Sequence, residues 1–148
     1  MPYEFRLRRR VEFSETDMAG IVHYSNFFRY MESAEHAFFR SLGFSIVTRE
    51  VDTPMGWPRV HASCDYKRPL KFEDEVEIHL LVTGKKAKSL SYEFRFRKVN
   101  ATLAEEVARG ALIVVCVRHE AGNMKSANIP AAIAEKIEVA PEEALRVA

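Results

Sequence analysis

Apolar residues recur at strand spacing, then at helix spacing, then at strand spacing again, and this order constrains the fold of the chain more than any other feature. Ser25 and Asn26 provide side chains suited to an N-cap, and Gly43 suits the C′ position of a helix. Between them the sequence predicts one long amphipathic helix. Its apolar stripe recurs at helical spacing: Phe27, Met31, Ala34, Phe38 and Leu42.

Strand-like alternation surrounds this helix on both sides. Residues 3–13 alternate ahead of it, and four longer segments follow, at about 57–66, 75–83, 89–97 and 111–117. The last segment is apolar on both faces, so we expect it to be central and buried on both sides. Pro130 opens a short helix of about 131–137, and the acidic tail after it is expected to fray.

Strands that follow one another without crossover helices form an antiparallel sheet, so the fold class is α+β. One long helix can cover only one face of that sheet. The other face is then buried elsewhere, most simply against a second copy of the chain. The order of elements therefore predicts an oligomer.

Composition narrows the class of protein but not its chemistry. The chain has 148 residues, 47% hydrophobic and 29% charged, which predicts a single globular domain over residues 1–148. A net charge of +1 argues against nucleic acid as a partner. Cys64 and Cys116 lie far apart and are expected to be reduced packing residues. We expect no membrane span, because the longest apolar run is 111–117, and a cytoplasmic location by default.

The link between the first strand and the helix carries a carboxylate, Asp17. Loops in such places often carry function, and this group could attack a carbonyl as a nucleophile or activate water as a base. The alternative is that Asp17 only forms an Asx turn ahead of Gly20.

The start of the predicted helix offers a second chemical group. Its free N–H groups and positive dipole end can polarise a carbonyl and stabilise an oxyanion, and the dipole favours Asp17 as a carboxylate. The alternative is that Ser25 or Asn26 caps these donors and nothing else binds. His23 could relay protons or simply face solvent, and the Tyr24 hydroxyl could orient a substrate or water.

Basic residues gather at the turn between two long strands. Lys85, Lys86 and Lys88 precede Ser89 there, and ammonium groups at such a turn suit phosphates. The alternative is a solvated hairpin turn whose lysines discourage edge pairing. The sequence has no Walker loop, G-x-G-x-x-G, G-x-S-x-G or H-E-x-x-H, so we expect no metal and no serine nucleophile.

The motif between Val11 and Phe39 carries a family resemblance: VEF, then T-D-x-A-G-I-V-x-Y-x-N, then F-x-R-Y. It resembles the 4-hydroxybenzoyl-CoA thioesterase family of hot-dog acyl-CoA thioesterases, and a weaker likeness continues to about His119. The resemblance implies a long helix wrapped by a curved antiparallel sheet. It also implies subunits that dimerise side by side, often as tetramers, with acyl pockets at the interface.

The resemblance assigns roles to particular residues. It implies that Asp17 is the catalytic carboxylate, that the Tyr24 N–H polarises the thioester carbonyl, and that Lys86, Lys88 and Ser89 bind CoA phosphates. The aliphatic branch of these enzymes usually has His where this chain has Tyr24, so the aromatic branch is favoured.

The predicted function is hydrolysis of an acyl-CoA, aromatic or short to medium aliphatic, by a homodimer or homotetramer without a cofactor. The pocket is expected to include His23, Asn26, Phe28 and Met31, with Trp57 as a further candidate. A non-catalytic acyl-CoA sensor of the same fold is the alternative.

Overall fold

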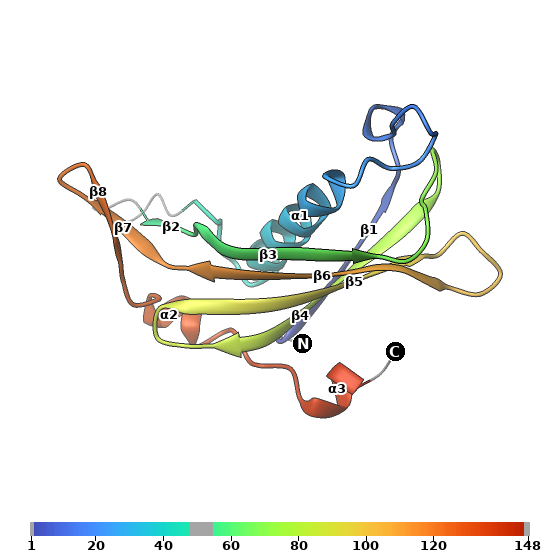
Figure 1. Ribbon diagram of the computed structural model, residues 1–148. Coiled ribbons are helices and arrows are strands. Elements are labelled where there is room, and N and C mark those ends of the chain that lie inside the picture. The colour runs from blue at the N-terminus through green and yellow to red at the C-terminus, as the bar shows by residue number, and fades with distance from the viewer. Residues whose placement is uncertain (1, 48–54, 147–148) are drawn as a thin grey trace.

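The structure is a computed structural model that describes residues 2–47 and 55–146. Its main layer is an antiparallel sheet of five strands in the order β1-β4-β5-β6-β3 (Figure 1). Among the described strands, β3 pairs with β6 alone and forms an edge of this sheet. The strands are β1 (Glu4–Arg10), β3 (Arg59–Tyr66), β4 (Glu75–Lys85), β5 (Ser89–Lys98) and β6 (Glu105–Val115).

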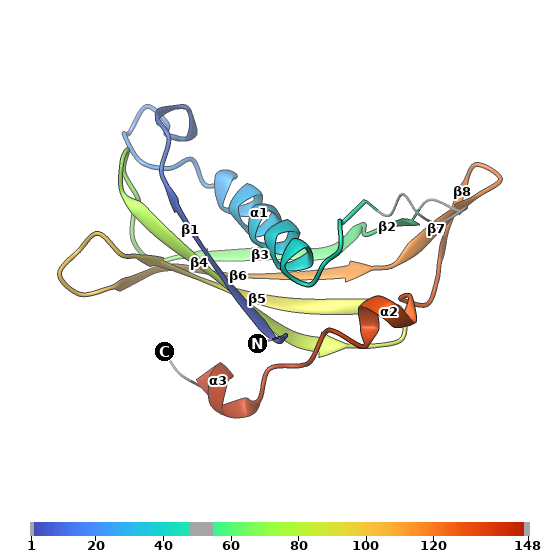
Figure 2. The ribbon, with the colours of Figure 1, turned by 180° about the vertical axis from the view of Figure 1, so that it is seen from behind.

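The long helix α1 (Asn26–Ser41) lies across one face of the sheet, and the sheet curves around it (Figures 1 and 2). Its predicted apolar stripe is confirmed, because Phe27, Met31, Ala34 and Phe38 are all buried. The sheet meets the stripe with side chains from alternate positions, as predicted: Val76, Ile78, Leu80 and Val82 of β4, and Leu90, Tyr92, Phe94 and Phe96 of β5. The α+β arrangement inferred from the hydrophobic periods is confirmed.

Two glycines serve this packing. Gly43 has φ +91° just beyond the helix, as a C′ glycine requires. Gly110 of β6 lies directly beneath Met31, where a Cβ would overlap the methionine Cε and lie 3.2 Å from the Ser63 carbonyl oxygen. The absence of a side chain at position 110 therefore lets α1 approach the sheet.

A smaller antiparallel sheet, β2-β7-β8, extends one end of the fold. It consists of β2 (Met55–Gly56), β7 (Val117–Glu120) and β8 (Asn123–Ser126). The short helices are η1 (Phe13–Glu15), α2 (Ala131–Ala134) and α3 (Glu142–Arg146). Among the residues that the structure describes, no helix is long and apolar enough to cross a membrane.

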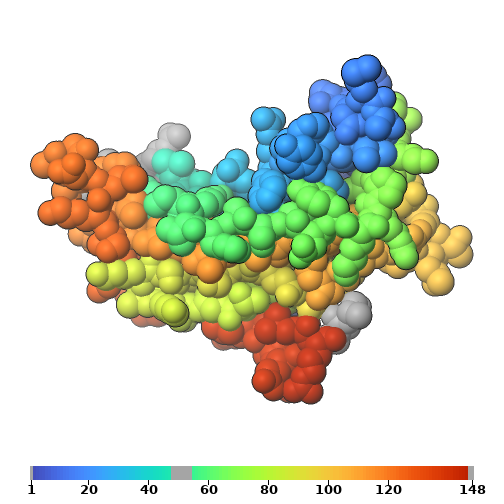
Figure 3. All heavy atoms as spheres, viewed as in Figure 1, coloured from blue at the N-terminus to red at the C-terminus, as the bar shows by residue number. Residues whose placement is uncertain are grey.

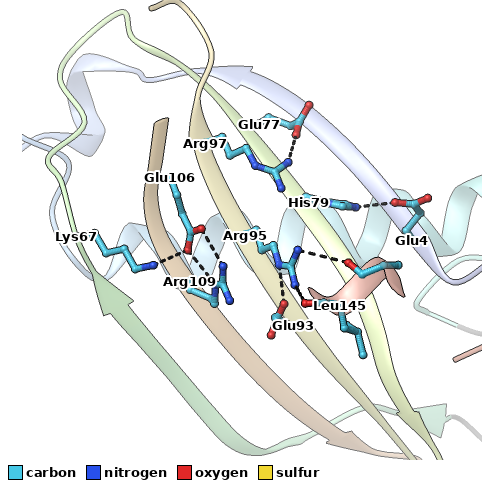
Figure 4. Close-up of polar contacts among 11 residues, drawn as sticks. Glu4, Lys67, Glu77, His79, Glu93, Arg95, Arg97, Glu106, Arg109 and Leu145 are labelled. Atoms are coloured by element: carbon cyan, nitrogen blue, oxygen red, sulfur yellow. Dashed lines mark hydrogen bonds and ion pairs between the residues drawn. The ribbon is translucent and has the colours of Figure 1, made fainter. Parts of the chain in front are cut away.

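The C-terminal segment packs against the sheet, so the prediction of a frayed tail is wrong for the residues up to 146. α3 lies on the face of the sheet opposite α1 (Figure 1). Its carbonyls at Ala144 and Leu145 accept hydrogen bonds from the guanidinium of Arg95, which is 1% exposed and also pairs with Glu93 at 2.7 Å (Figure 4). A buried cation therefore holds the tail in place.

The rest of this outer face is ionic and only partly covered. Arg97 pairs with Glu77 at 3.1 Å, and His79 contacts Glu4 at 2.7 Å (Figure 4). The outward residues of β6 are half-buried, whereas its inward residues, Leu112 and Val114, are buried. The prediction that this strand is buried on both sides is wrong within the protomer, because the outer face lacks a continuous apolar cover.

Candidate active site

The loop between β1 and α1 folds around the Asp17 carboxylate. Oδ1 accepts hydrogen bonds from the N–H groups of Ala19, at 2.9 Å, and Ile21, at 3.4 Å, and Gly20 follows with φ +82°. Asp17 therefore does form an Asx turn. Within the described part of the chain Oδ2 accepts no hydrogen bond, and the residue is half-buried. One oxygen shapes the loop while the other is left for chemistry.

Glu15 fixes this loop to the rest of the protein, a role that the sequence analysis missed. Its Oε2 accepts a hydrogen bond from Arg9 at 2.6 Å, and its Oε1 accepts bonds from the Tyr30 hydroxyl, at 2.9 Å, and the Glu12 N–H, at 2.8 Å. Burial, and after it Glu15, raises the pKa of Tyr30 well above its usual range, so this phenol stays a donor.

The predicted caps at the start of α1 have other partners. Ser25 occupies the N-cap position but its side chain makes no cap hydrogen bond; its hydroxyl lies 2.8 Å from His23 Nδ1, which also accepts the Ser25 N–H at 3.3 Å. The Asn26 side chain donates instead to the Glu15 carbonyl at 2.8 Å. The prediction of a Ser25 or Asn26 cap is therefore wrong, and His23 stands in for it.

The backbone N–H of Tyr24 is left over by this arrangement. The N–H groups of Asn26 and Phe27 donate to the carbonyls of His23 and Tyr24, at 2.9 Å and 3.3 Å. No acceptor for the Tyr24 N–H exists among residues 2–47 and 55–146. The Tyr24 ring is 64% exposed and stacks on the His23 ring, with centroids 4.5 Å apart. The helix start therefore offers one unused donor.

Asp17 and Tyr24 line one cavity of about 510 Å³. Most of its wall is apolar, and two cations lie at its rim. Lys67 pairs with Glu106 at 2.8 Å, and Arg68 pairs with Glu105 at 3.0 Å. The remaining lining residues are Ile21, Val22, Phe27, Tyr66, Pro69 and Leu70. The structure thus brings the two predicted catalytic groups together beside an apolar space.

The four predicted pocket residues are placed differently from one another. His23 lies beside Tyr24, and Asn26 ties the Asp17 loop to α1. Phe28 is half-buried and packs against the core, and Met31 is fully buried over Gly110. None of the four borders the 510 Å³ cavity within the described protomer. Trp57 packs on Phe39, away from the start of the helix, with ring centroids 5.5 Å apart.

The predicted CoA-binding residues lie at the far end of the sheet. Lys86 and Lys88 are exposed in the turn between β4 and β5, followed by the half-buried Ser89. The Asp17 loop is at the other end of β4, beside Asp74, whose carbonyl accepts the Val11 N–H (Figures 1 and 2). At about 3.3 Å per residue, the strand between them is about 33 Å long. One protomer therefore does not bring the two parts of the predicted site together.

A basic cavity borders the lysine turn. It measures about 380 Å³, and Lys88 shares it with Arg118 and Lys125 of the β7–β8 hairpin. No sequence pattern indicates these two residues, because their cations are brought to Lys88 by the pairing of β7 with β8. Lys85 is not free for a ligand, because its Nζ donates to the carbonyls of Ala134 and Ile137, at 2.9 and 2.7 Å.

Comparison with known proteins identifies the family. Residues 11–137 match the model of the thioesterase-like superfamily. A 1,4-dihydroxy-2-naphthoyl-CoA hydrolase of Prochlorococcus marinus is 29% identical over 127 residues, covering 81% of this chain and 78% of that protein. An Aquifex aeolicus protein named only provisionally as an esterase is 46% identical over 80 residues, covering 54% of this chain. That alignment spans 60% of the Aquifex protein's length.

Solved structures agree with the sequence matches. A gentisyl-coenzyme A thioesterase superposes with a TM-score of 0.78 at 31% identity, over 90% of this chain and 100% of that one. The 4-hydroxybenzoyl-CoA thioesterase of Pseudomonas sp. strain CBS-3 superposes with a TM-score of 0.79 at 21% identity, over 90% and 99%. The predicted hot-dog fold is confirmed, and three of these four relatives are named as hydrolases or thioesterases of acyl-CoA compounds. The chain belongs to the thioesterase-like superfamily.

Proposed function

We propose that the protein hydrolyses an acyl-CoA thioester to the free acid and CoA. The observation that carries this proposal is the shared cavity of Asp17 and Tyr24. Asp17, whose Oδ2 is uncommitted, and Tyr24, whose N–H has no acceptor within the described residues, both line the same largely apolar cavity. These are the two groups that acyl transfer needs: one to deliver or activate a nucleophile, and one to stabilise the oxyanion.

The reaction follows from these positions. The Asp17 carboxylate either attacks the thioester carbonyl carbon itself or removes a proton from an attacking water. The carbonyl oxygen gains negative charge in either case, and the Tyr24 N–H at the positive end of α1 donates to it. The C–S bond then breaks, and CoA leaves as the thiolate and takes a proton from solvent. Direct attack gives a mixed anhydride, which water hydrolyses to release Asp17.

We propose an aromatic acyl group as the substrate, with short or medium aliphatic groups as the alternative. Phe27 and Tyr66 present aromatic rings to the cavity, and Val22 and Leu70 complete its apolar wall. Two relatives are named for hydroxylated aromatic acyl-CoAs, the naphthoyl and gentisyl compounds. Aromatic rings pack favourably edge-on against aromatic walls, which supports such a substrate here.

We also propose that the working unit is a homodimer or homotetramer of single domains, 1–148, in the cytoplasm. β3 is an uncapped edge whose side chains are largely exposed, and it runs across the front of the molecule (Figure 3). Because Lys86 and Lys88 lie a strand's length from Asp17, we propose that a neighbouring protomer supplies them, with Ser89, to the CoA phosphates.

Thiol release tests the activity. Wild type and Asp17→Asn are compared on a panel of aromatic and aliphatic acyl-CoAs. We expect kcat to fall by about 10² in Asp17→Asn with a smaller loss of CoA-ester affinity. Near-normal turnover by the variant contradicts the mechanism. Saturable binding without turnover by both proteins would instead identify an acyl-CoA sensor.

Mixed oligomers test the sharing of the site. Asp17→Asn protomers are reassembled at equal ratio with Lys86→Ala/Lys88→Ala protomers and assayed at low substrate concentration. If the lysines act on the neighbouring protomer's substrate, mixed dimers regain one intact site, and activity returns to about a quarter of the wild-type level. If both parts served the same chain, mixing would restore nothing beyond the average of the two parents.

A further inference from the structure

Tyr66, the last residue of β3, reaches the start of α1 from a distant part of the chain. Its hydroxyl donates a hydrogen bond of 2.9 Å to the carbonyl of Tyr24, 42 residues away in sequence. Its ring packs edge-on against Phe27, with centroids 5.1 Å apart. All three residues line the cavity that contains Asp17. Tyr66 is therefore both a wall of the cavity and a link to the turn that bears the unused N–H.

The Tyr24 carbonyl is the part of the turn that gains most from such a link. The Tyr24 carbonyl receives the Phe27 N–H at 3.3 Å, a long bond, and the exposed Tyr24 side chain stacks on the His23 ring. Within the described residues, Tyr66 is the only side chain that bonds to the Tyr24 backbone. The hydroxyl therefore holds the peptide that follows Tyr24, while the Asn26 N–H, bonded to the His23 carbonyl at 2.9 Å, holds the peptide that precedes it.

Tyr66 itself is well anchored. It pairs with Ala108 of β6 in the sheet. Directly after it, the N–H groups of Lys67 and Arg68 both donate to the Val107 carbonyl, at 2.8 and 3.1 Å. Burial, followed by the neighbouring Cys64 thiol, raises the pKa of Tyr66 to about 12, so the phenol keeps its proton at neutral pH. A rigid strand end thus presents a permanent donor to the turn.

We propose that Tyr66 is a positioning residue for catalysis: its hydroxyl fixes the carbonyl side of Tyr24 and so restricts the residue whose N–H meets the oxyanion in the proposed reaction. The inference rests on the proposed thioester hydrolysis, in which that N–H stabilises the oxyanion. A donor that strengthens its bond mainly in the transition state affects kcat more than KM. Tyr66 thereby links the edge strand of the sheet to the chemical step.

Tyr66→Phe tests the proposal, because it removes one oxygen and keeps the ring against Phe27. We expect kcat to fall by about tenfold, less than the loss of a whole oxyanion donor, with KM within about twofold of wild type. Tyr3→Phe is the matched control, since the Tyr3 hydroxyl makes no hydrogen bond within the described chain and Tyr3 does not line the cavity. Its kcat and KM should equal those of wild type.

Amide hydrogen exchange supplies a readout that does not depend on activity. In Tyr66→Phe the hydrogen-bonded amides of residues 25–27 should exchange faster, while those of residues 30–40 in α1 keep their wild-type rates. Unchanged exchange, or a raised KM with kcat unchanged, overturns the positioning role. Asp17→Asn assayed in parallel separates the two ideas: normal turnover by that variant refutes the proposed function, whereas the exchange result still decides whether Tyr66 holds the turn.

Discussion

Replacing Glu15 by glutamine should loosen the Asp17 loop without changing the size of any side chain. Oε1 of Glu15 accepts from the Tyr30 hydroxyl and the Glu12 N–H, and Oε2 accepts from Arg9. An amide has one oxygen and one NH₂ group. If its oxygen replaces Oε1, the NH₂ group faces the Arg9 guanidinium; if it replaces Oε2, the NH₂ group faces the Glu12 N–H. Either orientation sets a donor against a donor.

The size of the effect follows from burial. The side chains of Glu15 and Arg9 are 16% and 29% exposed, so their 2.6 Å bond is only partly screened by water. A charge-assisted hydrogen bond in such a place contributes about 1.5–3 kcal/mol, and we expect Glu15→Gln to lower the free energy of unfolding by about 2 kcal/mol. Because Asp17 is two residues away, kcat should also fall by about fivefold or more.

Urea unfolding followed by far-ultraviolet circular dichroism measures the first quantity, and thiol release measures the second. Glu142→Gln is the control, because its ion pair with Arg146 is exposed on α3 and should contribute no more than about 0.5 kcal/mol. A free energy of unfolding for Glu15→Gln within 0.5 kcal/mol of wild type would refute the reasoning, since the donor conflict would then cost nothing.

Three further predictions concern the scaffold. A Cβ on Gly110 would overlap Met31, so Gly110→Ala should lower the free energy of unfolding, measured in urea, by about 2 kcal/mol. The double variant Gly110→Ala/Met31→Ala should be more stable than the sum of the two single losses predicts, because removing the methionine relieves the overlap. Additive losses would contradict this. A hydrogen bond from Arg109 lowers the pKa of Glu106 to about 2, so the Glu106 carboxylate stabilises the fold above the ordinary carboxyl pKa and that stabilisation is lost as pH falls through 2. Glu106→Gln should therefore cost about 1 kcal/mol at pH 7, roughly half of that at pH 3 and little below pH 2, and an equal cost at pH 7 and pH 3 would be inconsistent with the shift. Lys85 donates to two carbonyls at the end of α2, so Lys85→Met should speed amide exchange in residues 131–137, and unchanged exchange would show that the lysine does not hold this helix.

The helix and the strands were predictable because their apolar residues repeat regularly over many positions. The stripe from Phe27 to Phe38 buries as its spacing indicates, and Gly43 ends the helix as predicted. The ends of helices and strands were harder to predict from the sequence. Ser25 and Asn26 have the chemistry of caps, but each is bound elsewhere, by His23 and by the Glu15 carbonyl. Competition of this kind depends on folded contacts and leaves no periodic signal.

In the candidate site, residues that are close in sequence were predictable, and residues that meet through strand pairing were not. Asp17 and Tyr24 are seven residues apart on either side of one turn, so local reasoning places them together. Tyr66 meets them only through the register of β3 with β6, and Arg118 and Lys125 meet Lys88 only through the β7–β8 hairpin. Strand register depends on the whole sheet, and a single sequence does not state which residues face one another across it.

The arrangement around Tyr24 explains why so many separate contacts meet at one turn. An N–H without a protein acceptor costs about 1–3 kcal/mol if it is buried dry, so in the free protein it needs access to water from the open cavity. A substrate oxyanion replaces that water only if the donor already points at it; otherwise the reaction must reorganise the turn and the gain is lost. Glu15 holds the loop before the turn, His23 caps the helix within it, and Tyr66 fixes its carbonyl. If the Tyr24 N–H stabilises the oxyanion as we propose, catalysis should weaken when any of these three anchors is removed, even though none of the three needs to touch the reacting carbon.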